Sequence, residues 1–245
     1  MTKSPPVSLV SLFLVLFLLS VTPVDSYCTI PSGFGPGEQL IYDVDWGLIN
    51  AGETELSILD TVRVNGHLCY HLLSRTHSNN FVTTFFKVDD RVESMMDVAG
   101  LFSRGFQKHL REGDYREDRW FRISQEEQLV FQLDTTATTK YTADTLQVEF
   151  GVQDVLSALQ YVRLQDLEPG TEIRVMTVDN LNPYELVVKV HRRQRVKVPA
   201  GRFDCLVVEP LLKSTGLFKS KGKLTIWLTD DERRLPVLMK SKILI

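Results

Sequence analysis

The strongest constraint on the fold of this chain is an alternation of apolar and polar residues with a period of two. The clearest example is residues 38–46, in which Leu40, Tyr42 and Val44 share one side of the segment. The same alternation recurs in three further segments, at residues 53–58, 184–190 and 224–228. Because successive side chains of a β-strand point to opposite faces, this pattern predicts a series of half-buried strands.

Turn-forming residues separate the predicted strands. They occur at Asn65-Gly66, residues 112–114, Pro169-Gly170 and residues 198–201. Glycine adopts positive φ without steric cost and proline presets φ, so both residue types mark turns. Many short strands with frequent turns predict an all-β fold, mostly antiparallel and of the barrel-like or sandwich type. We expect a single β-rich domain over residues 27–245, because no linker-like segment or internal repeat interrupts the pattern.

One segment has a helical period instead. Within residues 153–163, Val155, Leu159 and Val162 recur at i, i+4 and i+7, and Asp154 stands near the start. This spacing places the three apolar residues on one face of an α-helix. The sequence therefore predicts one short helix here, which we expect to cap or plug the sheet.

The N-terminal residues form a candidate export signal. Lys3 precedes an apolar run at residues 7–21, which only serines interrupt, and Pro23 follows it. A positive residue, an apolar run and a short polar region in this order are typical of a secretory signal peptide. A retained membrane anchor is the alternative, because the run is close to the length that spans a bilayer. We expect residues 1–26 to be removed after Ser26 and the mature protein to be exported.

Three cysteines follow this cleavage site. Acylation of Cys28 would make the protein a lipoprotein, but Asp25 and Tyr27 stand where a lipobox has an aliphatic and a small residue. We therefore expect no lipidation. Three thiols allow at most one internal disulfide, and whether one forms among Cys28, Cys69 and Cys205 stays open. Cys69 and Cys205 lie in apolar segments, which predicts buried thiols.

Charge and motifs exclude several functional classes. The chain has 28 Lys+Arg and 31 Asp+Glu, a formal net charge of −3, which argues against a nucleic-acid-binding protein. The sequence contains no G-x-S-x-G, H-E-x-x-H, P-loop or dinucleotide fingerprint, so it predicts no catalytic residues and no cofactor. His67 and His71 are four residues apart in a strand-like segment. In a strand this offset separates the two side chains by about 13 Å, so they cannot bind one metal ion together. The acidic run at residues 230–232 lacks the ligand spacing of a calcium loop, so we expect no metal site.

Two groups of basic residues are candidates for anion binding. Arg193, Arg195 and Lys197 alternate along one predicted strand and share a face. A second band comprises Arg104, Lys108, Arg111, Arg116, Arg119 and Arg122. Such surfaces suit lipid headgroups or acidic glycans. The favoured alternative is a solvated sheet face whose charges pair with nearby acids, because such cross-strand pairs are common.

The aromatic residues are predicted to lie mainly in the core, although some of them can line a cavity. The set considered is Phe81, Phe85, Phe86, Phe102, Phe106, Trp120, Phe121 and Phe131. Large aromatic side chains bury much apolar area, so the core is their default location.

Several ordered segments resemble the bacterial "domain of unknown function 3108" family. They are residues 37–46 (GEQLIYDVDW), Ala51-Gly52, residues 154–163 (DVLSALQYVR), residues 198–205 (VPAGRFDC), residues 226–231 (IWLTDD) and residues 235–237 (LPV). The resemblance implies an exported, periplasmic protein with a mostly antiparallel, barrel-like fold. It implies no activity and supplies no catalytic residues. Family members usually continue past the position of Ile245 with a glycine turn and a final strand, so a truncated C-terminus stays open.

Three functional classes remain. We expect a non-catalytic binding or carrier protein for an apolar or amphiphilic envelope molecule, with an envelope lipid or glycan as its partner. The alternative is an assembly or interaction module that contacts another envelope protein by strand addition. Residues 236–245 favour it, because they predict a half-buried strand with an exposed edge. A hydrolytic enzyme without a recognisable motif is the weaker alternative.

Overall fold

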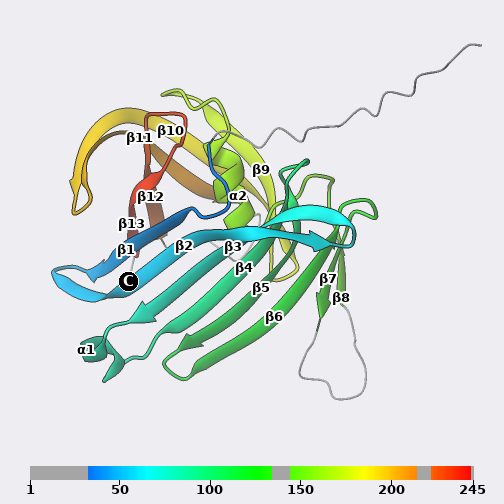
Figure 1. Ribbon diagram of the computed structural model, residues 1–245, viewed down its shortest axis with the longest axis horizontal. Helices are drawn as coiled ribbons and strands as arrows, with labels where there is room; N and C mark the ends of the chain where they lie inside the picture. Colours follow the sequence, from blue (N-terminus) through cyan, green and yellow to red (C-terminus); the bar gives the residue numbers. More distant parts are fainter. Residues whose placement is uncertain (1–32, 134–143, 214–221, 244–245) are drawn as a thin grey trace, which may run out of the picture.

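The computed structural model describes residues 33–133, 144–213 and 222–243, which form two antiparallel sheets (Figure 1). In the first sheet the eight strands follow one another in chain order. They are β1 (Gln39–Trp46), β2 (Ile49–Val64), β3 (His67–Ser78), β4 (Asp89–Asp97), β5 (Ser103–Glu112), β6 (Tyr115–Ser124), β7 (Leu129–Leu133) and β8 (Asp144–Gln147). The prediction of a mostly antiparallel all-β fold is confirmed.

The second sheet has five strands in the order β13-β12-β11-β10-β9. They are β9 (Glu172–Asp179), β10 (Asn182–Val198), β11 (Gly201–Lys213), β12 (Gly222–Thr229) and β13 (Pro236–Ile243). The two sheets meet at β1 and β13, where the Tyr42 hydroxyl donates a hydrogen bond to the Pro236 carbonyl. β13 is an edge strand, as the sequence predicts for residues 236–245, of which 244 and 245 lie outside the described residues.

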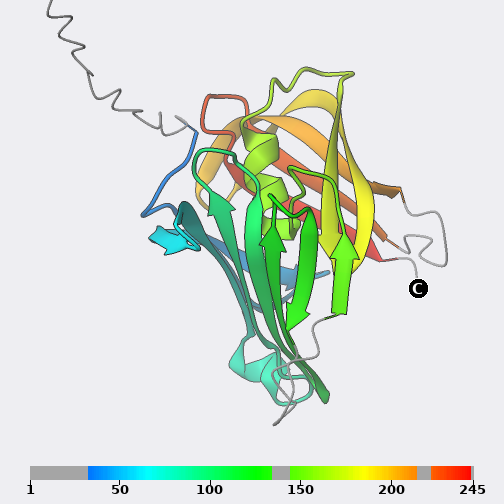
Figure 2. The ribbon, with the colours of Figure 1, turned by 90° about the vertical axis from the view of Figure 1, so that its right-hand side faces the viewer.

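Helix α2 (Val155–Arg163) confirms the predicted helix and lies between the two sheets (Figure 2). Its first turn is closed by a capping box. Asp154 Oδ1 accepts hydrogen bonds from the backbone N–H groups of Leu156 and Ser157 at 2.8 and 3.0 Å, and the Ser157 hydroxyl accepts one from the Asp154 N–H at 2.9 Å. A capping box satisfies N–H groups that a helix start leaves unpaired.

The core is arranged around α2. On one side Ala158 and Val162 pack with buried residues of the second sheet, including Leu206 and Leu228. On the other side α2 contributes partly buried residues to a cluster with Tyr70, Leu72 and Met96 of the first sheet. The helix therefore joins the two sheets through apolar contacts on both of its sides, as expected for a plug.

Arg163, at the end of α2, is a fully buried cation. Its guanidinium binds both carboxylate oxygens of Glu38, at 2.6 and 2.9 Å. It also donates to Gln160 Oε1 at 2.6 Å and to the Arg233 carbonyl at 3.0 Å. A buried charge is tolerated only when it is paired and hydrogen-bonded. Arg163 therefore holds the helix, the segment before β1 and the β12–β13 turn together.

A second helix, α1 (Asn80–Thr83), is a single turn that the sequence pattern does not predict. The Asn79 side chain caps it by accepting a hydrogen bond from the Val82 N–H at 2.9 Å. In the described part of the chain, neither helix is long and apolar enough to cross a membrane. The predicted signal peptide at residues 1–26 and the predicted absence of acylation at Cys28 both fall outside the described residues.

Candidate functional site

The basic residues proposed from the sequence on β10 are largely neutralised. Arg193 and Arg195 are exposed at the surface, and each has carboxylate partners within 3.2 Å. These partners are Glu168, Asp230 and Asp204. Lys197 is exposed on the same strand. This geometry favours the alternative of a solvated sheet face, and anion binding at these three residues stays a prediction.

The second basic band does not exist as one surface. Arg104 is buried rather than solvated, and Lys108 and Arg111 point to opposite faces of β5 because they are an odd number of residues apart. Lys108 pairs with Asp179, and Arg111 pairs with Asp118. The expectation of a shared surface is wrong, because strand geometry divides these cations between two faces.

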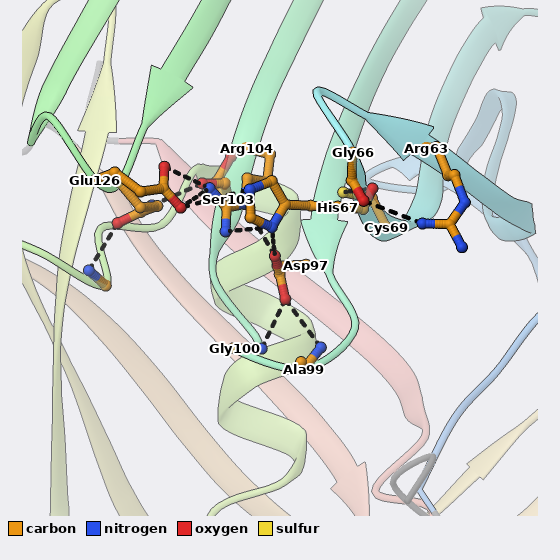
Figure 3. Close-up of polar contacts among 12 residues, drawn as sticks. Arg63, Gly66, His67, Cys69, Asp97, Ala99, Gly100, Ser103, Arg104 and Glu126 are labelled. Atoms are coloured by element: carbon orange, nitrogen blue, oxygen red, sulfur yellow. Dashed lines mark hydrogen bonds and ion pairs between the residues drawn. The ribbon is translucent and has the colours of Figure 1, made fainter. Parts of the chain in front are cut away.

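Arg104 is the centre of a polar network at one end of the first sheet (Figure 3). Its Nε donates to Asp97 Oδ2 at 2.9 Å, and its Nη1 donates to both Glu126 oxygens at 2.7 and 2.8 Å. Nη2 lies 3.1 Å from Nδ1 of His67. The other oxygen of Asp97 accepts hydrogen bonds from the backbone N–H groups of Ala99 and Gly100 in the β4–β5 turn. The network ties β3, the β4–β5 turn and the β6–β7 turn together.

Cys69 lies beside this network, so the cluster has the composition of a Cys-His-Asp triad. In register, Cys69 is directly opposite Asp97 and two residues from His67. Burial raises the pKa of the Cys69 thiol to about 11, and the Asp97 carboxylate adds to this shift. Both ring nitrogens of His67 face Arg104, Asp97 or Glu126 rather than the sulfur. A nucleophile requires a thiolate beside a base, so the geometry does not favour the hydrolytic alternative.

The described cysteines have structural environments. Cys69 and Cys205 are both buried and free, which confirms the prediction of buried thiols. Burial also raises the pKa of the Cys205 thiol to about 11. Both thiols are therefore protonated at neutral pH and pack as small apolar side chains.

The face of the first sheet that points away from α2 is polar. Ser94 points toward the helix, where it bonds Asp154, so its neighbour Glu93 points to the opposite face. Glu93 accepts hydrogen bonds from Arg91 and Gln107 at 2.6 Å and from His71 at 2.5 Å. Burial opposes the charge of Glu93, but these three donors outweigh burial and lower its pKa to about 2.

Two hollows lie on this polar face. One has a volume of about 260 Å³, and we call it the Trp120 hollow; it is lined by Arg91, Glu93, Gln107, His109, Asp118 and Trp120, with Lys108 beside them. The other has a volume of about 430 Å³ and lies near α1, between charged residues that include Glu53, Arg75 and Lys87. Among the described residues, no cluster of three or more His, Cys, Asp and Glu side chains is arranged to hold a metal ion.

The β1–β2 turn and α1 lie at the end of the molecule away from α2 (Figure 1). Large apolar side chains are exposed in and next to both segments. We call this the apolar end, and it comprises Trp46, Leu48, Ile49, Phe81, Phe85 and Phe86. Trp46 and Leu48 are 83% and 104% exposed, and Phe85 is 77% exposed. Trp46, Leu48 and Ile49 lie at and beside the β1–β2 turn, Phe81 lies in α1, and Phe85 and Phe86 follow α1. The two segments are adjacent, because the Asn79 backbone N–H and side-chain amide donate to the Ala51 and Asn50 carbonyls at 2.9 and 2.7 Å.

The prediction that these aromatics lie mainly in the core is wrong for four of the eight, of which Trp120 lines a hollow. Phe102, Phe106 and Phe121 are buried, but Phe81, Phe85, Phe86 and Trp120 are 47–77% exposed. Phe81 lies in the one-turn helix α1, and Phe85 and Phe86 lie in the segment between α1 and β4, which no second layer covers. The sequence does contain a signal that sets these two segments apart. Residues 46–51 and 79–86 contain no charged residue, although 24% of the chain is charged.

The family of the chain follows from comparison with known proteins. The model of the family described as "Protein of unknown function (DUF3108)" matches residues 41–245. The chain belongs to the DUF3108 family. The resemblance found in the sequence is thus confirmed, and this DUF3108 protein inherits no activity from its family description. A search of curated proteins finds no match to it.

A solved structure shares the fold. It is the crystal structure of a "Beta-barrel-like Protein of Domain of Unknown Function DUF1849 from Brucella abortus", which matches with a TM-score of 0.55 and 12% sequence identity. The match covers 84% of the DUF3108 chain and 90% of the other chain. At this identity the likeness shows the barrel-like fold alone, so the function must be argued from the site itself.

Proposed function

We propose that this DUF3108 protein is a non-catalytic binding protein of the cell envelope that contacts the acyl chains of an amphiphilic lipid through its apolar end. The observation that carries the proposal is the gathering of six exposed large apolar side chains on two adjacent, uncharged segments. Export to the periplasm, which the N-terminal sequence suggests, would place the protein between two lipid membranes and is part of the proposal.

The energetic argument rests on the exposed area. Soluble proteins rarely expose contiguous large apolar patches, and those that do occur mark interaction sites. Removing a Leu or Phe side chain from water stabilises a complex by about 1.5–3 kcal/mol, so six such side chains offer about 9–18 kcal/mol. Micromolar binding needs about 8 kcal/mol in addition to an association cost of at least about 4 kcal/mol, which lies within this range.

Shape and charge favour lipid over a folded protein as the partner. None of the six residues lines either of the two hollows, and they project from the β1–β2 turn and from the segment formed by α1 and the residues after it. A deformable acyl layer adapts to such projections, whereas a protein partner needs a complementary surface. Trp and Phe are also typical of membrane interfaces, and the absence of charge in residues 46–51 and 79–86 removes the desolvation penalty.

Vesicle flotation tests the proposal. We expect the purified protein to float with vesicles of phosphatidylethanolamine and phosphatidylglycerol, and the double variant Leu48→Ser/Phe85→Ser to remain in solution. The matched control is Leu68→Ser/Phe150→Ser, which removes the same residue types, 40% and 62% exposed, from outside the apolar end. This control should float like the parent. Equal flotation of both double variants, or no flotation of the parent protein, would overturn the proposal.

A second arm distinguishes the source of the acyl chain. Dihexanoylphosphatidylcholine below its micellar concentration offers single lipid molecules, and Trp46 reports their binding through its fluorescence. A response to both vesicles and monomeric lipid indicates a carrier of lipid molecules. A response to vesicles alone indicates docking on a bilayer surface.

Strand addition at β13 is the second candidate function. Among the described strands β13 pairs only with β12, and an edge strand presents unpaired N–H and C=O groups to other chains. Addition between two copies predicts a solution mass that doubles as the concentration rises. A monomer at every concentration, measured by light scattering, would contradict self-pairing at this edge.

A further inference from the structure

The Trp120 hollow lies on the polar face of the first sheet and is separate from the apolar end. We propose that this hollow binds a neutral saccharide, with one sugar ring stacked on Trp120 and its hydroxyls bonded by Gln107, Arg91 and His109. This inference does not depend on lipid binding, because none of the six residues of the apolar end lines the hollow.

Trp120 supplies the stacking surface. It stands on β6 directly opposite Gln107 of β5, so both side chains point to the same face. Trp120 is 47% exposed, although a tryptophan on a sheet usually buries most of its area. Pyranose rings with equatorial hydroxyls have an apolar C–H face, which suits the π-face of an exposed indole.

Gln107 presents an acceptor that has no partner. Its side-chain nitrogen donates to Glu93 Oε1 at 2.6 Å. A carboxylate can only accept, so this contact requires the amide nitrogen to face Glu93 and leaves the amide oxygen as the other atom. That oxygen is buried and has no hydrogen-bond partner within the described structure. A buried orphan acceptor costs about 1–3 kcal/mol and is relieved by a donor such as a sugar hydroxyl.

Arg91 and His109 complete the set. Arg91 uses only its Nε to bind Glu93, at 2.6 Å, so its two Nη groups have no partner within residues 33–133, 144–213 and 222–243. The Nδ1 atom of His109 faces the Asp118 carboxylate, which can only accept, so Nδ1 donates there and Nε2 is left as an acceptor. Donors and acceptors around one aromatic face match a ligand that is rich in hydroxyls, since each hydroxyl both donates and accepts.

The charge balance selects a neutral ligand. The hollow has two carboxylates, Glu93 and Asp118, and each is paired with a guanidinium group, Glu93 with that of Arg91 and Asp118 with that of Arg111. Both carboxylates are saturated, since Glu93 has three donors and Asp118 is bonded by both Arg111 and His109. An added anion or cation would therefore meet no net attraction. The volume of about 260 Å³ is below the usual range for drug-sized ligands, which limits the contact to about one ring of a longer chain.

Calorimetric titration of the purified protein tests the proposal. The probes are the β-1,4-linked tetrasaccharides of glucose and of N-acetylglucosamine, with an acidic tetragalacturonate for comparison. We expect at least one neutral probe to bind and the acidic probe not to bind. The variant Trp120→Ala should weaken binding about tenfold, and Gln107→Leu, which keeps the size of the side chain, should weaken it by a similar factor.

The matched control is Trp46→Ala, which removes an exposed tryptophan from the apolar end and should leave saccharide affinity unchanged. Thermal unfolding checks that each variant folds. If Trp120→Ala does not fold, the affinity of Gln107→Leu decides the outcome. Unchanged affinity in Gln107→Leu, stronger binding of the acidic probe, or no binding of either neutral tetrasaccharide at millimolar concentration would overturn the proposal.

Discussion

The region around α2 and the apolar end of this DUF3108 protein differ in where their charged and apolar side chains lie. Around α2, Asp154 and Arg163 are buried, 0% and 2% exposed, and their polar atoms are held by hydrogen bonds. At the apolar end, Leu48 and Phe85 are 104% and 77% exposed, and residues 46–51 and 79–86 contain no charge. The difference teaches that polar groups at the α2 end are buried and paired, whereas the apolar end retains an energetic cost in water, which burial against a partner would remove.

The first test of this comparison is to break the buried ion pair at the α2 end. Replacing Arg163 by Met leaves the buried Glu38 carboxylate without its main partner, so we expect a loss of about 3–5 kcal/mol in the free energy of unfolding. Urea unfolding at neutral pH measures it. The control is Arg233→Met, because Arg233 approaches the same carboxylate at 3.7 Å but is 58% exposed. Its loss should stay below about 1 kcal/mol, and equal losses would show that burial does not decide the effect.

The second test uses the polar face between the two ends. Hydrogen bonds lower the pKa of Glu93 from 4.5 to about 2, against the effect of burial. A carboxyl with a lowered folded-state pKa stabilises the protein above its unfolded pKa, and this contribution disappears as the pH falls from about 5 to 2. The expected loss is on the order of 3 kcal/mol. Between these pH values, the free energy of unfolding should depend less on pH in Glu93→Gln than in the parent protein. The same dependence on pH in both proteins would contradict the lowered pKa of Glu93.

The third test concerns the cap of α2. Asp154→Ala removes the cap acceptor and leaves the Ser94 and Ser103 hydroxyls, each 2.5 Å from the carboxylate, without their partner. We expect a loss of about 2 kcal/mol. Burial raises the pKa of Asp154, so its ionised form destabilises the fold as the pH rises above its unfolded pKa. Asp154→Asn keeps one acceptor oxygen, so at pH 7 it should lose less free energy of unfolding than Asp154→Ala. The loss in Asp154→Asn should be larger at pH 4 than at pH 7, because the parent protein gains stability when Asp154 is protonated.

The smallest effect on stability is expected at the apolar end. The Leu48→Ser/Phe85→Ser variant removes side chains that contribute little to the core, so the free energy of unfolding without lipid should change by less than about 0.5 kcal/mol. Chemical unfolding measures it beside the flotation experiment. A loss comparable with that of Asp154→Ala would show that these residues support the fold, and the contrast between the two ends would fail.

Local sequence determined much of the fold. The period-two alternation in Leu40, Tyr42 and Val44 located β1, because strand geometry fixes the side of each residue. Asp154 and the helical spacing after it located α2, since capping and the helical period act over a few residues. The apolar setting of Cys69 predicted its buried thiol for the same reason.

Tertiary structure alone decided which of these residues meet and which remain exposed. Arg104 became the centre of a network because the sheet register places it beside Asp97 and a turn brings Glu126 to it, and no local pattern contains that information. Phe85 and Trp120 are exposed because no second layer covers α1 or the outer face of β6, whereas Phe106 is buried within a cluster that includes Val178 of β9. Exposure depends on contacts between segments distant along the chain, so the sequence determined the strands and α2, and packing determined the candidate sites.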